Sequence, residues 1–135
     1  MRPFKLEYKS LREILLNREL AAFGDAYVNF LYSLAMSKRR GHPVGIKVSS
    51  RILADALRRA GLRKLLPRRV NRHAQADAVE ALVVYAWVED VINIQEGVSL
   101  LVDHEDAVEA FCTLLCTIAQ RMKLKGQISA TSHGN

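Results

Sequence analysis

Two carboxylates, Asp77 and Glu80, lie three residues apart in the segment Ala-Asp-Ala-Val-Glu-Ala-Leu at positions 76–82. On a helix this spacing places both side chains on one face within a single turn. Neighbouring carboxylates repel each other, and the apolar run that continues to Val88 makes ionising both still less favourable unless a cation lies between them. The pair is therefore a candidate set of metal ligands. The alternative is that Asp77 only favours the first turn of a helix through the helix dipole, while Glu80 is a solvated helix residue.

A third acid, Asp25, lies in the almost wholly apolar segment 18–36, which predicts a helix buried nearly all round. An unpaired buried carboxylate is unfavourable, so Asp25 requires a partner, either an arginine or a metal ion. Gly24, next to it, costs a helix interior about 1 kcal/mol relative to alanine. Its presence predicts a close approach of another helix or of another subunit.

The elements that would position these acids are all helical. Apolar periodicity, capping residues and Gly or Pro stops predict helices at 8–16, 18–36, 51–60, 76–88 and 105–123, with one short helical turn at 62–67. No alternating strand pattern of useful length is present, so the predicted fold class is all-α. We expect one domain over residues 1–125, followed by a polar tail at 126–135 that is disordered.

Composition excludes some classes of protein and leaves others. The chain of 135 residues has no apolar stretch of the kind found in signal peptides or membrane spans, so we expect a soluble, cytoplasmic protein. Cys112 and Cys116 lack the spacing of a zinc site and are interpreted as reduced core residues. The histidines have no mutual spacing typical of a ligand set and are predicted to lie on the surface or in the tail: His42, His73, His104 and His133.

The net charge of +6 is distributed unevenly. Between Lys38 and Arg72 there are twelve lysines and arginines against one acid, whereas from His73 to Gln120 there are nine acids and no lysine or arginine. Such a basic segment favours binding to a polyanion such as nucleic acid, with release of counterions. The alternative is a solvated face that keeps the protein soluble.

Two of these segments carry a resemblance to a known family. Leu-Ala-Ala-Phe-Gly-Asp-Ala at 20–26, followed roughly fifty residues later by Ala-Asp-Ala-Val-Glu-Ala-Leu at 76–82, resembles the two signature segments of the ribonuclease III nuclease domain. In that family the first reads Glu-Arg-Leu-Glu-Phe-Leu-Gly-Asp-(Ala/Ser) and the second Ala-Asp-x-x-Glu-Ala-Leu. Residues 52–62 are similar to the helix between them, which ends in a Leu-Gly-Leu-like element. The resemblance spans roughly residues 10–120, and its second segment is the specific one.

The resemblance implies a homodimeric all-α nuclease domain that binds Mg²⁺, or Mn²⁺ in its place, and cuts both strands of double-stranded RNA. Asp25, Asp77 and Glu80 match three of the four family carboxylates, so they are the implied catalytic residues and metal ligands. Ala21 stands where the family has the fourth, and Arg18 where it has the preceding glutamate. Asn29, four residues after Asp25, is a candidate neutral ligand. The chain resembles the short type without a double-stranded-RNA-binding domain, which in bacteria trims ribosomal RNA precursors.

Two functions stay open at this point. Mg²⁺ commonly takes only one or two protein carboxylates, so three acids are enough to hold an ion and the chain is expected to be an endoribonuclease. The alternative is a catalytically weak or inactive RNA-binding protein of the same fold. In either case we expect basic residues that flank the acidic site to hold the RNA backbone: Lys38, Arg39, Arg40, Arg68, Arg69 and Arg72.

Overall fold

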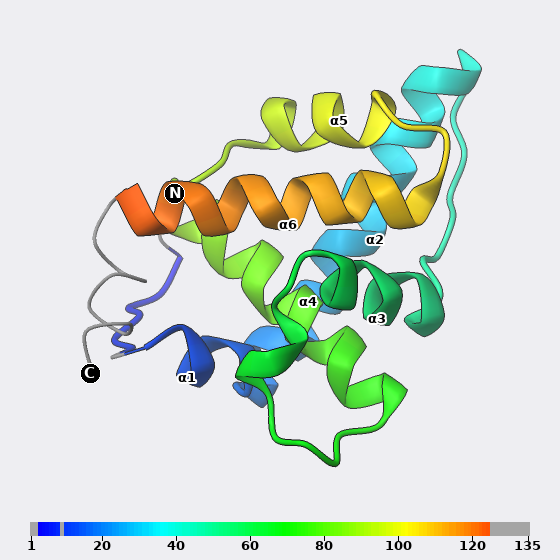
Figure 1. Cartoon of the computed structure of the whole chain (residues 1–135). Helices are drawn as coiled ribbons and strands as arrows, with labels where there is room; N and C mark the ends of the chain where they lie inside the picture. Colours follow the sequence, from blue (N-terminus) through cyan, green and yellow to red (C-terminus); the bar gives the residue numbers. More distant parts are fainter. Residues whose placement is uncertain (1–2, 9, 125–135) are drawn as a thin grey trace.

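Helices form the regular secondary structure of the protein, seen in a computed structural model that describes residues 3–8 and 10–124 (Figure 1). In chain order they are α1 (Leu11–Leu15), α2 (Arg18–Arg40), α3 (Ser50–Arg59), the 3-10 helix η1 (Arg63–Leu65), α4 (Arg72–Val88), α5 (Ile94–Val102) and α6 (Ala107–Leu124). No strand occurs among the described residues, and the all-α prediction is confirmed. The predicted tail at 126–135 and its disorder lie outside these residues, as does His133.

The helix ends follow the local chemistry of the sequence. The Ser49 side chain accepts a hydrogen bond from the Ile52 amide at 3.2 Å and caps α3. Gly41 ends α2 in the left-handed conformation, with φ of 77°. Helix α4 begins at Arg72, four residues before the predicted start, because the Asn71 side chain accepts from the Ala74 amide at 2.8 Å.

Helix α5 was not among the predicted helices. Asn93 and Glu96 form a capping box at its N-terminus, in which each side chain accepts a hydrogen bond from the backbone of the other. This signal was available in the sequence, since Asn followed three residues later by Glu is a recognised helix start.

Helix α4 lies at the centre of the fold because α1, α2, α3 and α6 all pack on it. Most of its residues from Ala76 to Val88 are buried, which confirms the apolar run as a core element. Helices α5 and α6 lie against each other, and α5 also packs on α2 (Figure 1). None of the described helices combines the length and the apolar character needed to cross a membrane.

Two predictions about the apolar faces of helices are wrong. Helix α2 is not buried all round, because its outer face, with Ala22, Phe23, Ala26 and Phe30, is exposed in the single chain. Cys116 is exposed on α6, so it is not a core residue, although both cysteines are free thiols as expected. In both cases the apolar composition of a helix did not indicate which of its faces another element would cover.

Candidate functional site

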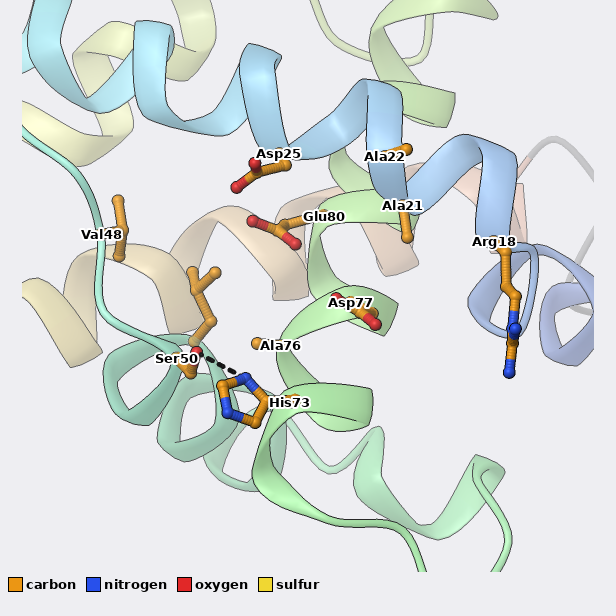
Figure 2. Close-up of a pocket in the computed structure, with 11 residues that line it drawn as sticks. Arg18, Ala21, Ala22, Asp25, Val48, Ser50, His73, Ala76, Asp77 and Glu80 are labelled. Atoms are coloured by element: carbon orange, nitrogen blue, oxygen red, sulfur yellow. Dashed lines mark hydrogen bonds between the residues drawn. The ribbon is translucent and has the colours of Figure 1, made fainter.

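A pocket of about 550 Å³ opens between α2, α3 and α4 (Figure 2). It brings together all three acids singled out in the sequence: Asp25 from α2, and Asp77 and Glu80 from α4. The rest of its lining is Arg18, Ala21, Ala22, Val48, Ser50, Leu53, His73 and Ala76. Acids separated by about fifty residues in the sequence therefore share one cavity.

Gly24 is the reason why the two helices bring these acids together. A Cβ atom built on Gly24 would lie 2.0 Å from the carbonyl oxygen of Glu80, much closer than any real contact. The predicted close approach at this glycine is confirmed, and the partner is helix α4 of the same chain. Because the α2 backbone lies directly against that of Glu80, the next residue, Asp25, is set beside the Glu80 side chain.

Glu80 is the buried acid of the site, with 8% of its surface exposed. Burial raises its pKa to about 8, and a hydrogen bond with Asp25 and the charges of Asp25 and Asp77 act in the same direction. Asp25 and Asp77 are exposed, so the expectation that Asp25 is the buried acid is wrong. The carboxyl groups of Asp25 and Glu80 face each other in Figure 2, with Asp77 one helical turn away along α4.

Asn29 contacts Asp25 directly. Its Nδ2 donates to the Asp25 carbonyl oxygen at 2.9 Å and to Asp25 Oδ1 at 3.1 Å, while its Oδ1 accepts from the Val48 amide at 2.8 Å. The side-chain oxygen that would have served as a neutral ligand is thus engaged with the backbone of Val48. Asn29 presents a donor to the site acid instead.

The donor set fits a hard divalent cation in its chemistry, since it consists of carboxylate oxygens. Among the described residues, no three histidine, cysteine or acidic side chains are gathered closely enough to hold one metal ion as they stand. Instead, Glu80 and Asp25 are joined by a hydrogen bond, with a proton favoured on Glu80 at neutral pH. A cation bound here would take the place of that proton and draw in Asp77 from the same face of α4.

The end of the pocket opposite the acid pair is lined by Ser50 and His73, which were not among the site residues predicted from the sequence. His73 is exposed, as predicted, and its Nδ1 lies 3.4 Å from Ser50 Oγ at the start of α3 (Figure 2). It precedes Asp77 by four residues and Glu80 by seven, so all three lie along one stripe of α4. This spacing in the sequence could have indicated that His73 lies on the same face of α4 as the two acids.

The predicted RNA-binding residues fall into two separate groups. Arg72 begins α4 next to His73, and Arg68 and Arg69 are exposed in the turn before it. The group formed by Lys38, Arg39 and Arg40 lies in the last turn of α2, roughly 20 Å along the helix from Asp25 at 1.5 Å per residue. None of these six residues lines the pocket, but Arg72 directly precedes the lining residue His73, so the first group adjoins the pocket through α4 and the second does not.

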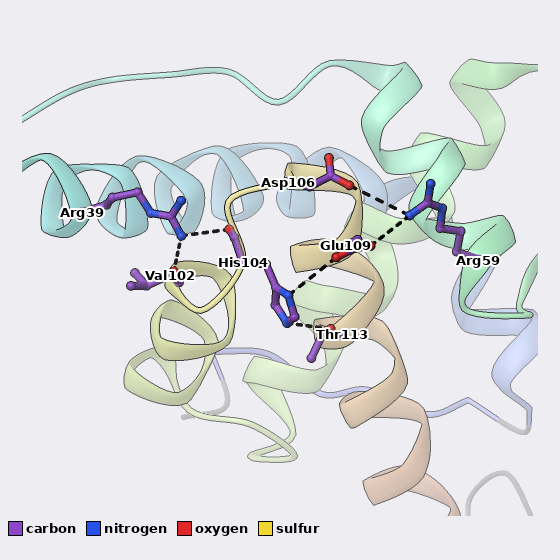
Figure 3. Close-up of polar contacts among 7 residues, drawn as sticks. All are labelled: Arg39, Arg59, Val102, His104, Asp106, Glu109 and Thr113. Atoms are coloured by element: carbon purple, nitrogen blue, oxygen red, sulfur yellow. Dashed lines mark hydrogen bonds and ion pairs between the residues drawn. The ribbon is translucent and has the colours of Figure 1, made fainter.

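Arg39 has a structural partner in the fold. Its guanidinium donates to the carbonyl oxygen of Val102, the last residue of α5, and, at 2.9 Å, to that of His104, two residues further on (Figure 3). The Val102 carbonyl, in the last turn of the helix, has no intrahelical donor. Arg39 therefore ties the end of α2 to α5, whereas its neighbours Lys38 and Arg40 are exposed.

Comparison with known proteins agrees with the site geometry. The family model described as Ribonuclease III matches residues 18–130 of the chain, a range that contains all three pocket acids. A search of curated proteins gives no significant match.

Proposed function

The chain belongs to the ribonuclease III family, and from this premise we propose that it is a Mg²⁺-dependent endoribonuclease that acts on double-stranded or structured RNA in the cytoplasm. The observation that carries the proposal is the buried carboxyl of Glu80, which faces Asp25 inside an open pocket. Two acids held this close disfavour ionising together, so a divalent cation is the ligand that stabilises both.

The residues that would hold the ion are Asp25, Asp77 and Glu80. When bound, Mg²⁺ supplies an activated water molecule and neutralises charge at the phosphoryl group. The contribution of the chain is to fix the acids: the contact at Gly24 sets Asp25 against Glu80, and burial holds the Glu80 side chain in place. Mn²⁺ has similar ligand preferences and is expected to replace Mg²⁺.

The basic residues beside the pocket favour RNA as the substrate. Arg68, Arg69 and Arg72 are exposed at the N-terminal end of α4, next to His73 in the pocket wall. Cations at this edge suit the phosphates of an A-form helix, which proteins recognise by shape and backbone. A ribosomal RNA precursor helix is therefore a suitable natural substrate to test beside a plain duplex.

We further propose a homodimer formed through the outer face of α2. Phe23 and Phe30 are 38% and 55% exposed, among the largest exposed apolar side chains of the described residues, and they lie on one face with Ala26 between them. An apolar stripe of this kind is typical of an interface. Sedimentation of the protein should give twice the mass of one chain, and Phe30→Glu should shift it to a monomer.

The experiment that tests the function is incubation with long double-stranded RNA and Mg²⁺ or Mn²⁺. We expect cleavage by the wild-type protein and none by Asp77→Asn combined with Glu80→Gln. The matched control is Asp103→Asn combined with Glu105→Gln, which removes the same charge from exposed acids outside the pocket. Equal cleavage by both double variants, or none by the wild type, contradicts the proposal.

A second candidate is an RNA-binding domain that does not cleave. Ala21 lines the pocket where the family pattern has a carboxylate. Among the described residues, no three histidine, cysteine or acidic side chains lie close enough together to hold one metal ion. The same experiment separates the two functions. Retention of RNA by the wild type without cleavage, weakened by replacing Arg68, Arg69 and Arg72 together, selects the binding domain.

A further inference from the structure

Side chains spaced four residues apart along α2 hold the extended segment that leads to α3. Ser37 Oγ accepts from the Val44 amide at 2.9 Å and donates to the Val44 carbonyl at 3.2 Å. Ser33 Oγ makes the same two bonds to Ile46, at 2.9 and 3.0 Å. Together with the bond from the Val48 amide to Asn29, they form what we call the α2 ladder: Asn29, Ser33 and Ser37 on residues 44–48.

The regular spacing of the α2 ladder has a geometric cause. Four residues of an α-helix rise about 6.0 Å, and two residues of an extended chain advance about 6.6 Å. A helix that presents a polar group every fourth residue therefore meets every second peptide group of a chain lying along it. One step further along α2, four residues before Asn29, the side chain is Asp25.

Asn29 differs from the serines because it bonds in two directions. Its Oδ1 is engaged with the Val48 amide, which fixes the orientation of the amide group and directs Nδ2 to Asp25. The bond uses Asp25 Oδ1, so the donor restricts the orientation of the carboxylate. Val48 also lines the pocket, so the same side chain joins the pocket wall to the site acid.

We propose that Asn29 is a positioning residue, which holds the Asp25 carboxylate toward Glu80 and thereby prepares the pocket for a divalent cation. The inference rests on the proposed function for the identity of the ligand. The other part of the inference, that Asn29 fixes the orientation of Asp25, depends only on the hydrogen bonds of Asn29. The serines of the ladder do not contact Asp25, so they hold the extended segment without affecting the acid.

The test compares Asn29→Ala with Ser33→Ala. Both remove an acceptor for the extended segment, and Ser33 makes one bond more to that segment than Asn29, so the control is stringent. Binding of Mn²⁺ by calorimetry should weaken at least fivefold in Asn29→Ala and stay within twofold of the wild type in Ser33→Ala. Three-bond couplings should report one Asp25 rotamer in the wild type and in Ser33→Ala, and rotamer averaging in Asn29→Ala.

The outcomes separate this inference from the proposed function. If the wild type binds no Mn²⁺, the proposed function fails, and the rotamer of Asp25 alone decides whether Asn29 positions it. If Asn29→Ala keeps one Asp25 rotamer, or if both variants lose Mn²⁺ affinity equally, the positioning role is overturned. Amide exchange at Val48 and Ile46 verifies that each variant has lost its intended bond and is otherwise folded.

Discussion

Two clusters of acids in this protein differ in how their charge is balanced. In the pocket, Asp25 faces Glu80, and the ion pairs of the described residues lie elsewhere. Between α3 and α6, Arg59 lies 3.7 Å from Glu109 and 4.0 Å from Asp106, and all three side chains are more than half exposed (Figure 3). The first cluster holds two facing acids in a cavity without an ion pair to either from a described residue, whereas the second has its own cation in solvent.

The difference indicates which acids are available for a ligand. Exposed ion pairs such as those of Arg59 contribute little to stability and need no further partner. A buried acid beside another acid is unfavourable for folding and is found where a site has a use for it. Of the nine acids between residues 73 and 120, only Asp77 and Glu80 line the pocket.

The largest effect is expected from closing the contact that builds the pocket. Gly24→Ala places a methyl group against the Glu80 backbone, which cannot retreat easily, so unfolding free energy should fall by about 3 kcal/mol or more. Chemical denaturation measures this. Gly45→Ala is the matched control, because nothing lies within 4 Å of the added atom and the loss should be small. Similar losses in both variants would contradict the close packing.

A pH dependence should distinguish the pocket from the exposed cluster. Below about pH 4.5, Glu80 is protonated in both the folded and the unfolded chain; above that, the unfolded chain releases the proton while the folded protein keeps it up to its pKa of about 8. Without divalent ions, stability should therefore fall as the pH rises through this window, by up to about 1.4 kcal/mol per unit, and level off above it.

Denaturation at several pH values in the presence of a chelator measures this fall. Glu80→Gln should remove most of the dependence, whereas Glu109→Gln, in the exposed cluster, should leave it in place. A stability that rises between pH 5 and 8 in the wild type, but not in Glu80→Gln, would show that Glu80 is ionised in the fold.

Ala21→Glu should sharpen the contrast by adding a fourth acid to the pocket. Ala21 is buried in the pocket wall one turn before Asp25, so the new carboxylate joins the acid pair. We expect a loss of about 1 kcal/mol of stability without metal and about tenfold tighter Mn²⁺ binding. Ala21→Gln has nearly the same size and no charge, so it should lose stability without gaining affinity. Equal Mn²⁺ affinity in the two variants would place Ala21 outside the metal site.

The smallest effect is expected at the exposed cluster. Arg59→Ala removes the cation that faces Asp106 and Glu109, and the change in unfolding free energy should stay below about 1 kcal/mol. RNA cleavage should be unchanged. A marked loss of cleavage would contradict the distinction between the two clusters, because it would show that the exposed cluster contributes to the reaction.

Sequence patterns indicated which acids share the pocket better than they indicated the surroundings of those acids. Helical spacing placed Asp77 and Glu80 on one face, and Gly24 indicated the close helix contact that carries Asp25 to them. The burial of Asp25 was predicted wrongly, because the apolar composition of a helix does not show which of its faces packs on the core. Glu80 is buried instead, since it lies on α4 at the centre of the fold.

Other parts depend on contacts between distant segments, which local patterns do not encode. Lys38 and Arg68 belong to one basic stretch of sequence, yet Lys38 lies in the last turn of α2, whereas Arg68 lies in the turn that leads into α4 and its pocket residue His73. Asn29 was interpreted as a neutral ligand because only its distance along the helix from Asp25 was known. Its second partner, Val48, comes from a segment whose path no periodicity predicts.

The α2 ladder restricts how the connection between α2 and α3 can change in length. Successive peptide groups of an extended chain point in opposite directions, so one residue inserted between Ile46 and Val48 would turn the wrong group toward Asn29. An insertion near Gly41, before the first ladder bond, leaves the register intact. Among homologous chains, insertions and deletions in this connection should therefore gather at its α2 end and avoid the stretch that approaches the pocket.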